Sequence, residues 1–358
     1  MSPPEEMVDL LIQKMQTSHL DESRIMFVGD LYESETNVQS LENLCITVKT
    51  GNEPSMLASL MGVFCRRVSQ LEEQHPVRVR AGRISEICFS HYSFREFPPD
   101  MMDRRGDIGN GGDIFPNVRF CCEIDQCTNL TSLRTIIAQF PNIVLLKVQR
   151  CPMLKSIESL SGGCPNLELL SMQDCGLVCK PEELENNNSK CSWDSAFEAL
   201  SRNRGQFELI LRDCKALNTI PPSIQLLRNK LMVLSLDDLP NLKYLPSEIG
   251  ALASLSLLRV TNTGITSLPP EIGRLDPSCA VFIQGEIVCP PKCYRGSIAA
   301  MKKYFTRRRM KVFKGFVLLS ILFHRARSRA IERLFRPGGG GYKRCQDRFI
   351  LMSRKRSK

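Results

Sequence analysis

Residues Leu231–Leu275 read LMVLSLDDLPNLKYLPSEIGALASLSLLRVTNTGITSLPPEIGRL, and the second half of this stretch repeats the first. Each half carries alternating apolar residues followed by the ending L-P-x-E-I-G-x-L. Equivalent residues of the two halves are Leu234 and Leu258, Leu236 and Val260, Pro246 and Pro269, and Ile249 and Ile272. The step from Leu236 to Val260 is 24 positions, which predicts similar units stacked along one axis.

This pattern resembles the leucine-rich-repeat superfamily. Leu234 and Leu236 predict a short strand with inward apolar side chains, and Pro246 and Ile249 predict a turn that closes the convex side. One unit cannot bury its apolar edge alone, whereas stacked units share a continuous core and a parallel sheet. The predicted fold is therefore an α/β leucine-rich-repeat solenoid, with the sheet on its concave face, an irregular or helical convex side, and a helical basic C-terminal tail.

The same pattern extends in weaker form over most of the chain. The predicted domains are an N-terminal helix and strand cap at 1–40, the solenoid at 41–292, a cap helix at 293–305, and a basic amphipathic helix and disordered tail at 306–358. The solenoid is expected to be irregular to about 114 and regular over 115–292, with an insertion at 178–205. The N-terminal helix either caps the solenoid or is a remnant of an upstream domain.

Spacing along the chain gives the expected register. Ile46 and Phe89 lie 43 positions apart, which fits one irregular repeat or two degenerate ones. Later strand positions are Cys122, Val148, Met172, Leu211, Leu236, Val260 and Ile283, separated by 26, 24, 39, 25, 24 and 23. The long step contains the insertion with the only tryptophan, Trp193, and residues 193–200 predict a helix on the convex side.

Charge is distributed unevenly along the 358 residues. Residues 301–358 contain 19 Lys and Arg against Glu332 and Asp347, whereas residues 1–300 contain 29 basic and 36 acidic residues. Only the tail is therefore a candidate for anionic partners. The acidic, amphipathic N-terminal stretch MSPPEEMVDLLIQKMQ does not resemble a secretory signal. A cytoplasmic location with reduced thiols is expected, with nuclear import or peripheral membrane association as alternatives.

The chain holds 16 cysteines and four histidines, but no matched set of metal ligands. Cys127, Cys151, Cys175 and Cys214 recur where leucine-rich repeats usually have Asn, three residues after the last strand position. We expect them to be structural thiols that satisfy the neighbouring backbone. The Gly-rich stretch 104–113 lacks the Lys-Ser/Thr ending of a phosphate-binding loop and predicts a surface loop. No cofactor and no enzymatic activity are expected.

The openings CPNLELLSMQDCGL and FPNIVLLKVQRCPML, the L-P-x-E-I-G-x-L endings and the cysteines at the Asn place resemble the repeats of plant intracellular disease-resistance receptors, the NLR proteins. The resemblance covers roughly 84–292. It implies a protein-recognition module in defence or intracellular signalling. Two departures stand out, since no G-x-x-x-x-G-K-[ST] motif of a nucleotide-binding domain is present and the basic tail is not part of the family pattern.

Side chains that alternate with the buried strand positions are expected on the concave face, where such proteins bind their partners. The predicted protein-binding residues are Lys147, Gln149, Arg150, Ser171, Gln173, Asp174, Arg212, Asp213, Asp237, Asp238, Arg259 and Thr261. One column, Arg150, Asp174, Asp213, Asp238 and Asn262, has an acidic centre that fits a basic partner segment. The alternative is a solvated sheet face without a ligand.

The tail, RRRMKVFKGFVLLSILFHRARSRAIERLFR at 307–336, predicts a basic amphipathic helix. Its apolar run, 315–323, is about half of the roughly 20 residues that span a bilayer. An anionic membrane surface or a helix-binding, calmodulin-like protein is the predicted partner, with nuclear import and a solvent-exposed helix as alternatives, and nucleic acid less favoured. The predicted tail-binding residues are Arg307, Arg308, Arg309, Lys311, Phe316, Phe323, Arg325, Arg327 and Arg329.

Overall fold

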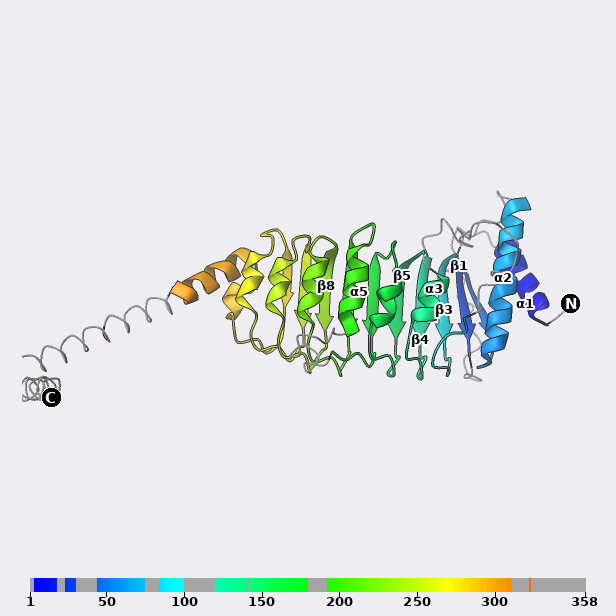
Figure 1. The fold of residues 1–358 in the computed structure, drawn as a ribbon, viewed down its shortest axis with the longest axis horizontal. Helices are drawn as coiled ribbons and strands as arrows, with labels where there is room; N and C mark the ends of the chain where they lie inside the picture. Colours follow the sequence, from blue (N-terminus) through cyan, green and yellow to red (C-terminus); the bar gives the residue numbers. More distant parts are fainter. Residues whose placement is uncertain are drawn as a thin grey trace, which may run out of the picture. The chain divides into compact units, whose positions relative to one another are not determined.

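The computed structural model describes residues 3–17, 23–29, 44–74, 84–99, 120–140, 142–179, 192–310 and 322. The chain divides into two units, 1–302 and 303–358. The first unit is built on one ten-stranded sheet in the order β10-β9-β8-β7-β6-β5-β4-β3-β1-β2, and every neighbouring pair is parallel (Figure 1).

The strands are short, as expected for stacked repeats. They are β1 (Ser23–Val28), β2 (Leu44–Lys49), β3 (Ile84–Ser90), β4 (Phe120–Asp125), β5 (Ile143–Gln149), β6 (Leu169–Gln173), β7 (Phe207–Arg212), β8 (Leu231–Asp237), β9 (Leu257–Thr261) and β10 (Ala280–Ile283). Leu146 pairs with Leu170, and Leu234 with Leu258, so the predicted 24-residue step is confirmed as the register of the sheet.

Helices and 3-10 turns cover one face of the sheet, which we call the turn side (Figure 1). They are α3 (Arg134–Gln139), η2 (Glu158–Gly162), α5 (Ser192–Ser201), η3 (Pro222–Leu227), η4 (Ser247–Ala251) and η5 (Pro270–Arg274). Between the sheet and these elements lies the core, in which Leu146, Leu170, Leu234 and Leu258 are fully buried. The predicted helix of the insertion is confirmed as α5, which packs between η2 and η3.

At the N-terminal end the strand order departs from the sequence order. β1 pairs with β3 on one side and with β2 on the other, so the 43 positions between Ile46 and Phe89 are not a repeat step. The helices α1 (Pro3–Thr17) and α2 (Pro54–Gln74) lie at this end of the sheet (Figure 1), which is where a solenoid requires a cap. The predicted domain limits at 40 and 41 are not tested by this arrangement.

One predicted step was wrong. Cys122 pairs with Leu146, and Ile124 pairs with Val148, so the step from β4 to β5 is 24 and not 26. The error arose because β4 continues to Asp125, and its last buried position is Ile124 rather than Cys122. With this correction Cys127 lies three residues after the last buried strand position, like Cys151, Cys175 and Cys214.

Close contact between successive repeats leaves no room for a side chain at several glycines, among them Gly176 and Gly264. A Cβ atom at Gly176 would lie 1.9 Å from the carbonyl oxygen of Pro152, and one at Gly264 would lie 2.2 Å from that of Pro240. Both clashes are with backbone, which cannot rotate away. We expect Gly264→Ala to lower the free energy of unfolding by about 2–3 kcal/mol, because the repeats must separate locally. Urea denaturation followed by circular dichroism measures this change.

Gly205→Ala is the matched control for Gly264→Ala. No heavy atom lies within 4 Å of a Cβ atom built at Gly205, so this variant is expected to stay within about 0.5 kcal/mol of the wild type. Equal denaturation midpoints for the two variants would show that the repeats are packed less closely than the structure indicates.

The first unit ends with η6 (Lys292–Tyr294) and helical residues 298–302, near the cap helix predicted at 293–305. In the second unit, residues 303–310 are helical. Arg307, Arg308 and Arg309 are exposed there, whereas Lys311, Phe316, Phe323, Arg325, Arg327 and Arg329 lie outside the described residues. Among the helices that the structure describes, none has both the length and the apolar character needed to cross a bilayer.

Candidate protein-interaction surface

The face of the sheet opposite the turn side is lined by the residues that alternate with the core positions, and we call it the open face. The register aligns these residues in rows that run across the strands. On β5–β9 the first row is Leu145, Leu169, Glu208, Val233 and Leu257, the second is Lys147, Ser171, Ile210, Ser235 and Arg259, and the third is Gln149, Gln173, Arg212, Asp237 and Thr261.

A fourth row follows directly after the strands and has a conformation of its own. Arg150, Asp174, Asp213, Asp238 and Asn262 all have φ between 49° and 56°, and His91 and Gln126 extend the row to β3 and β4. This left-handed region is tolerated better by Asn and Asp than by other non-glycine residues. The polar column predicted from the sequence therefore has a backbone reason, independent of any ligand.

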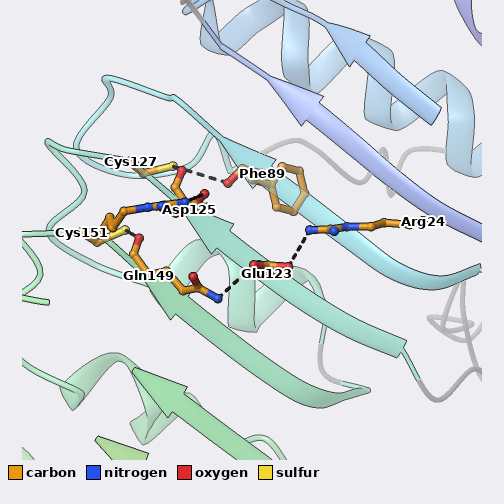
Figure 2. Close-up of polar contacts among 8 residues, drawn as sticks. Arg24, Phe89, Glu123, Asp125, Cys127, Gln149 and Cys151 are labelled. Carbon is orange, nitrogen blue, oxygen red and sulfur yellow. Dashed lines mark hydrogen bonds and ion pairs between the residues drawn. The ribbon is translucent and has the colours of Figure 1, made fainter. Parts of the chain in front are cut away.

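The cysteines after this row are structural, as predicted. The Cys127 thiol lies 3.7 Å from the carbonyl oxygen of Phe89 and the Cys151 thiol 3.2 Å from that of Gln149 (Figure 2). Cys175 and Cys214 make equivalent contacts with Val148 and Met172. All four side chains are buried, so their weak S–H donors satisfy carbonyl groups inside the solenoid.

An ion-pair network that the sequence did not predict lies on the open face of β1, β3, β4 and β5. Arg24 on β1 contacts Glu86 on β3 at 3.3 Å and Glu123 on β4 at 2.8 Å. Lys147 on β5 approaches Glu86 at 3.6 Å, and the Gln149 amide donates to Glu123 at 3.1 Å. Arg24 and Gln149 thus reach the Glu123 carboxyl from opposite sides, as Figure 2 shows. The sequence signal that could have predicted this network is a charged residue between two core positions of a strand.

The two carboxyls of this network differ in acidity. Burial raises the pKa of Glu86, but its hydrogen bond with Glu123 and the charges of Arg24 and Lys147 outweigh burial, so this pKa lies below its ordinary value. Burial and the hydrogen bond with Glu86 hold the pKa of Glu123 above its ordinary value. Folding therefore favours the charged form of Glu86 and disfavours that of Glu123.

These opposite shifts predict opposite effects of one substitution. At pH 7 we expect Glu86→Gln to destabilise the fold by about 0.5–1 kcal/mol and Glu123→Gln to leave it unchanged or slightly more stable, since both groups are partly screened by solvent. The Glu86 contribution is lost as the pH falls through its lowered pKa, whereas the Glu123 cost develops as the pH rises through its raised pKa. Urea denaturation at pH 7 and near pH 4 tests this. A larger loss for Glu123→Gln at pH 7 would contradict the assignment.

Most charged residues predicted to bind a partner instead form ion pairs within the protein. Arg150 forms an ion pair with Asp125 of the preceding strand, and Lys147 belongs to the network above. On β8, the Asp237 side chain is only 3% exposed and accepts from Arg259 at 3.0 Å and from Ser235 at 2.8 Å. Thr261 also donates to Asp237, and Arg212 lies 3.9 Å away. Asp237 is therefore an internal anchor of the sheet and not a free acidic group.

A smaller set stays available for an external ligand. Within the described part of the chain, the carboxylates of Asp174, Asp213 and Glu208 make no ion pair, and Asp238 only accepts from Asn262 at 2.9 Å. Ser171 and Gln173 are partly exposed between them. The same strands carry the partly exposed apolar side chains Leu145, Leu169, Ile210, Val233 and Leu257. The middle of the open face thus combines apolar contacts with unpaired negative charge.

Two cysteines on the open face are unsuited to nucleophilic chemistry. Burial and the charge of Glu123 raise the pKa of Cys88 to about 12, and burial and the charge of Glu86 raise the pKa of Cys121 to about 12. A thiol is a nucleophile and a metal ligand as its thiolate. Both groups are therefore protonated at neutral pH and contribute contacts only.

The fold is a leucine-rich-repeat solenoid. The parallel register and the 24-residue step show this directly. No protein-family profile and no curated protein matches the sequence. Among solved structures, the leucine-rich-repeat domain of the type III effector XopL is similar with a TM-score of 0.37 and 15% identity, over 65% of this chain and 83% of that one.

A leucine-rich-repeat protein of Leptospira interrogans is similar to the chain with a TM-score of 0.34 and 18% identity, over 66% of this chain. The match spans about half, 52%, of the Leptospira chain. Similarity at this level carries no information about ligands. The assignment of a function therefore depends on the side chains of the open face.

Proposed function

We propose that this protein is a non-catalytic interaction module that binds a protein partner on the open face of β5–β9. The single observation that supports this most is the row of partly exposed apolar residues on a face otherwise lined by polar groups, represented by Leu145, Leu169, Val233 and Leu257. Protein interfaces combine apolar side chains with neighbouring polar groups in this way. The paired charges around them fix the side chains and lower the entropic cost of binding.

Site-specific photocrosslinking tests the location of the partner. A benzophenone amino acid at Ser171, on the open face, is compared with the same group at Glu158, on the turn side. In native extract, a protein adduct from position 171 and none from position 158 is expected. The adduct is further expected to decrease with Leu169→Asn and to persist with Leu226→Asn, because Leu226 is 44% exposed on the turn side. Adducts from position 158 alone, or from neither position, would refute the proposal.

The biological setting that we propose is defence or intracellular signal transduction in the cytoplasm. Its support is the resemblance of the repeat endings at 245–252 and 268–275, and of the cysteines at the Asn place, to plant disease-resistance receptors. A role in defence predicts that loss of the protein changes the response to a pathogen and not growth without one. An unchanged pathogen response in a deletion line would remove this part of the proposal.

A second candidate function is a peripheral membrane or helix-binding adaptor that acts through the tail. The exposed Arg307, Arg308 and Arg309 on helical residues 303–310 favour it. Clustered Arg and Lys beside an apolar stretch bind anionic lipids in a salt-dependent way. Flotation with vesicles of phosphatidylserine and phosphatidylcholine is expected to recover the full chain at low salt and less of it at high salt. No recovery at either salt would exclude lipid binding.

A further inference from the structure

The open face has dimensions that suit one kind of partner element. Neighbouring strands of a sheet are about 4.8 Å apart, which is close to the rise of one α-helical turn, about 5.4 Å. A helix that lies across the strands therefore places one side-chain row, at i, i+3 or i+4, and i+7, opposite successive strands. The five strands β5–β9 span about 19 Å, the length of about 13 helical residues.

The width of the face, measured along the strands, also fits a single helix. The first row, with Leu145, and the fourth row, with Arg150, are five residues apart along β5, or about 16 Å. A helix with its side chains is about 10–12 Å wide. A helix centred between the first and second rows would place its contact stripe on the apolar side chains and turn one flank toward the fourth row. The chemistry of the first and fourth rows therefore decides what the helix carries.

The first row supplies apolar contacts, and the unpaired carboxylates decide the charge of the flank that faces the fourth row. Leu145, Leu169, Val233 and Leu257 are partly exposed, and Ile210 extends the apolar area into the second row. Asp174 and Asp213 lie in the fourth row without an ion pair to the described residues, and Glu208 lies in the first. The basic residues Lys147, Arg150, Arg212 and Arg259 are already engaged with acids.

We infer that the open face of β5–β9 binds an amphipathic α-helix of about 13 residues that has an apolar stripe and, beside it, one basic flank. This rests on the proposed function and specifies the chemistry of the partner. In this mode of recognition an amphipathic helix lays its apolar face on a protein surface. Apolar side chains one turn apart supply affinity, and the flanking charges supply specificity. An acidic helix would meet uncompensated carboxylates, and an extended peptide would not match the strand spacing with its side chains.

Three synthetic peptides of the same length test the inference with the full-length protein. The first is a 14-residue helix with Leu at one face and Lys on one adjoining flank, the second has Glu in place of Lys, and the third repeats the first with two central Pro residues. Calorimetry or fluorescence anisotropy at two salt concentrations measures binding. The Lys peptide is expected to bind, more weakly at high salt, and the Glu and Pro peptides to bind at least tenfold more weakly.

Protein variants show whether binding uses the predicted residues. Asp174→Asn with Asp213→Asn retains residues that tolerate the left-handed backbone and is expected to weaken the Lys peptide about tenfold and reduce its salt dependence. Glu158→Gln, on the turn side, is the control for charge and is expected to have no effect. Leu169→Asn is expected to weaken binding about tenfold, whereas Leu226→Asn is not. Circular dichroism confirms that each variant is folded.

Several results would overturn the inference. They are equal binding of the Lys and Glu peptides, equal binding of the Pro peptide, no binding of any peptide, or unchanged affinity in the double Asp variant. If photocrosslinking from position 171 still captures a protein in these cases, the proposed function stands and only the basic helix is excluded. If that crosslink is absent as well, both proposals are wrong.

Discussion

Trp193→Ala is expected to lower the free energy of unfolding by about 3–5 kcal/mol, the largest loss for any single substitution proposed for this chain. The side chain is fully buried in α5, its ring packs edge-on against Phe197 with centroids 5.9 Å apart, and its Nε1 donates to the Val178 carbonyl at 3.2 Å. The variant loses the apolar contact and the hydrogen bond together and leaves a cavity between η2 and η3. Urea denaturation followed by far-ultraviolet circular dichroism measures the loss.

Two comparisons make this result specific. Trp193→Phe retains an aromatic ring but leaves the Val178 carbonyl without its donor, so a loss of about 1–3 kcal/mol is expected. Leu226→Ala, at a side chain that is 44% exposed, is expected to stay within about 0.5 kcal/mol of the wild type. If Trp193→Ala lowers the free energy of unfolding no more than Leu226→Ala does, α5 does not belong to the core.

Trp193 also shows how far the sequence predicts this fold. The 24-residue step, the inward Leu positions and the helix of the insertion follow from spacing, because each repeat buries the same few positions against its neighbour. The full burial of Trp193 did not follow, since a polar segment precedes it, its hydrogen-bond partner Val178 lies outside the helix, and burial requires that η2 and η3 flank α5. The position of β1 between β2 and β3 was missed for the same reason, because sequence order does not determine pairing at the end of a sheet.

The candidate site was predicted in part. The alternation of side chains placed Lys147, Ser171 and Arg259 on one face, and the register confirms that they share a row. The partners of these charges could not be predicted, because Glu86 lies in the irregular N-terminal part, the strand of Glu123 was predicted two residues out of register, and Arg24 lies in a strand outside the repeat order. Protein binding by this face stays a prediction. The binding role of the tail residues beyond the described part of the chain stays a prediction as well.

The second large loss of stability is expected at Asp237. A comparison with its neighbour distinguishes charges that stabilise the sheet from charges that are free to bind a partner on the open face. Asp237→Asn is expected to lower the free energy of unfolding by about 2–3 kcal/mol, less than for a fully buried ion pair because Arg212 and Arg259 are 44% and 47% exposed. The variant keeps the size of the side chain but presents an amide N–H group to donors on two neighbouring strands. Urea denaturation again measures the change, with the slope checked for constancy.

The next residue supplies the control for Asp237. Asp238→Asn makes the same change at a side chain that only accepts from Asn262, and Asn tolerates the backbone conformation there, so a change within about 0.5 kcal/mol is expected. If Asp238 contacts the partner helix, Asp238→Asn lowers the affinity for the Lys peptide, whereas Asp237→Asn lowers the stability of the fold. Similar losses of stability for both variants would contradict the division, because they would show that the fourth row also holds the strands together.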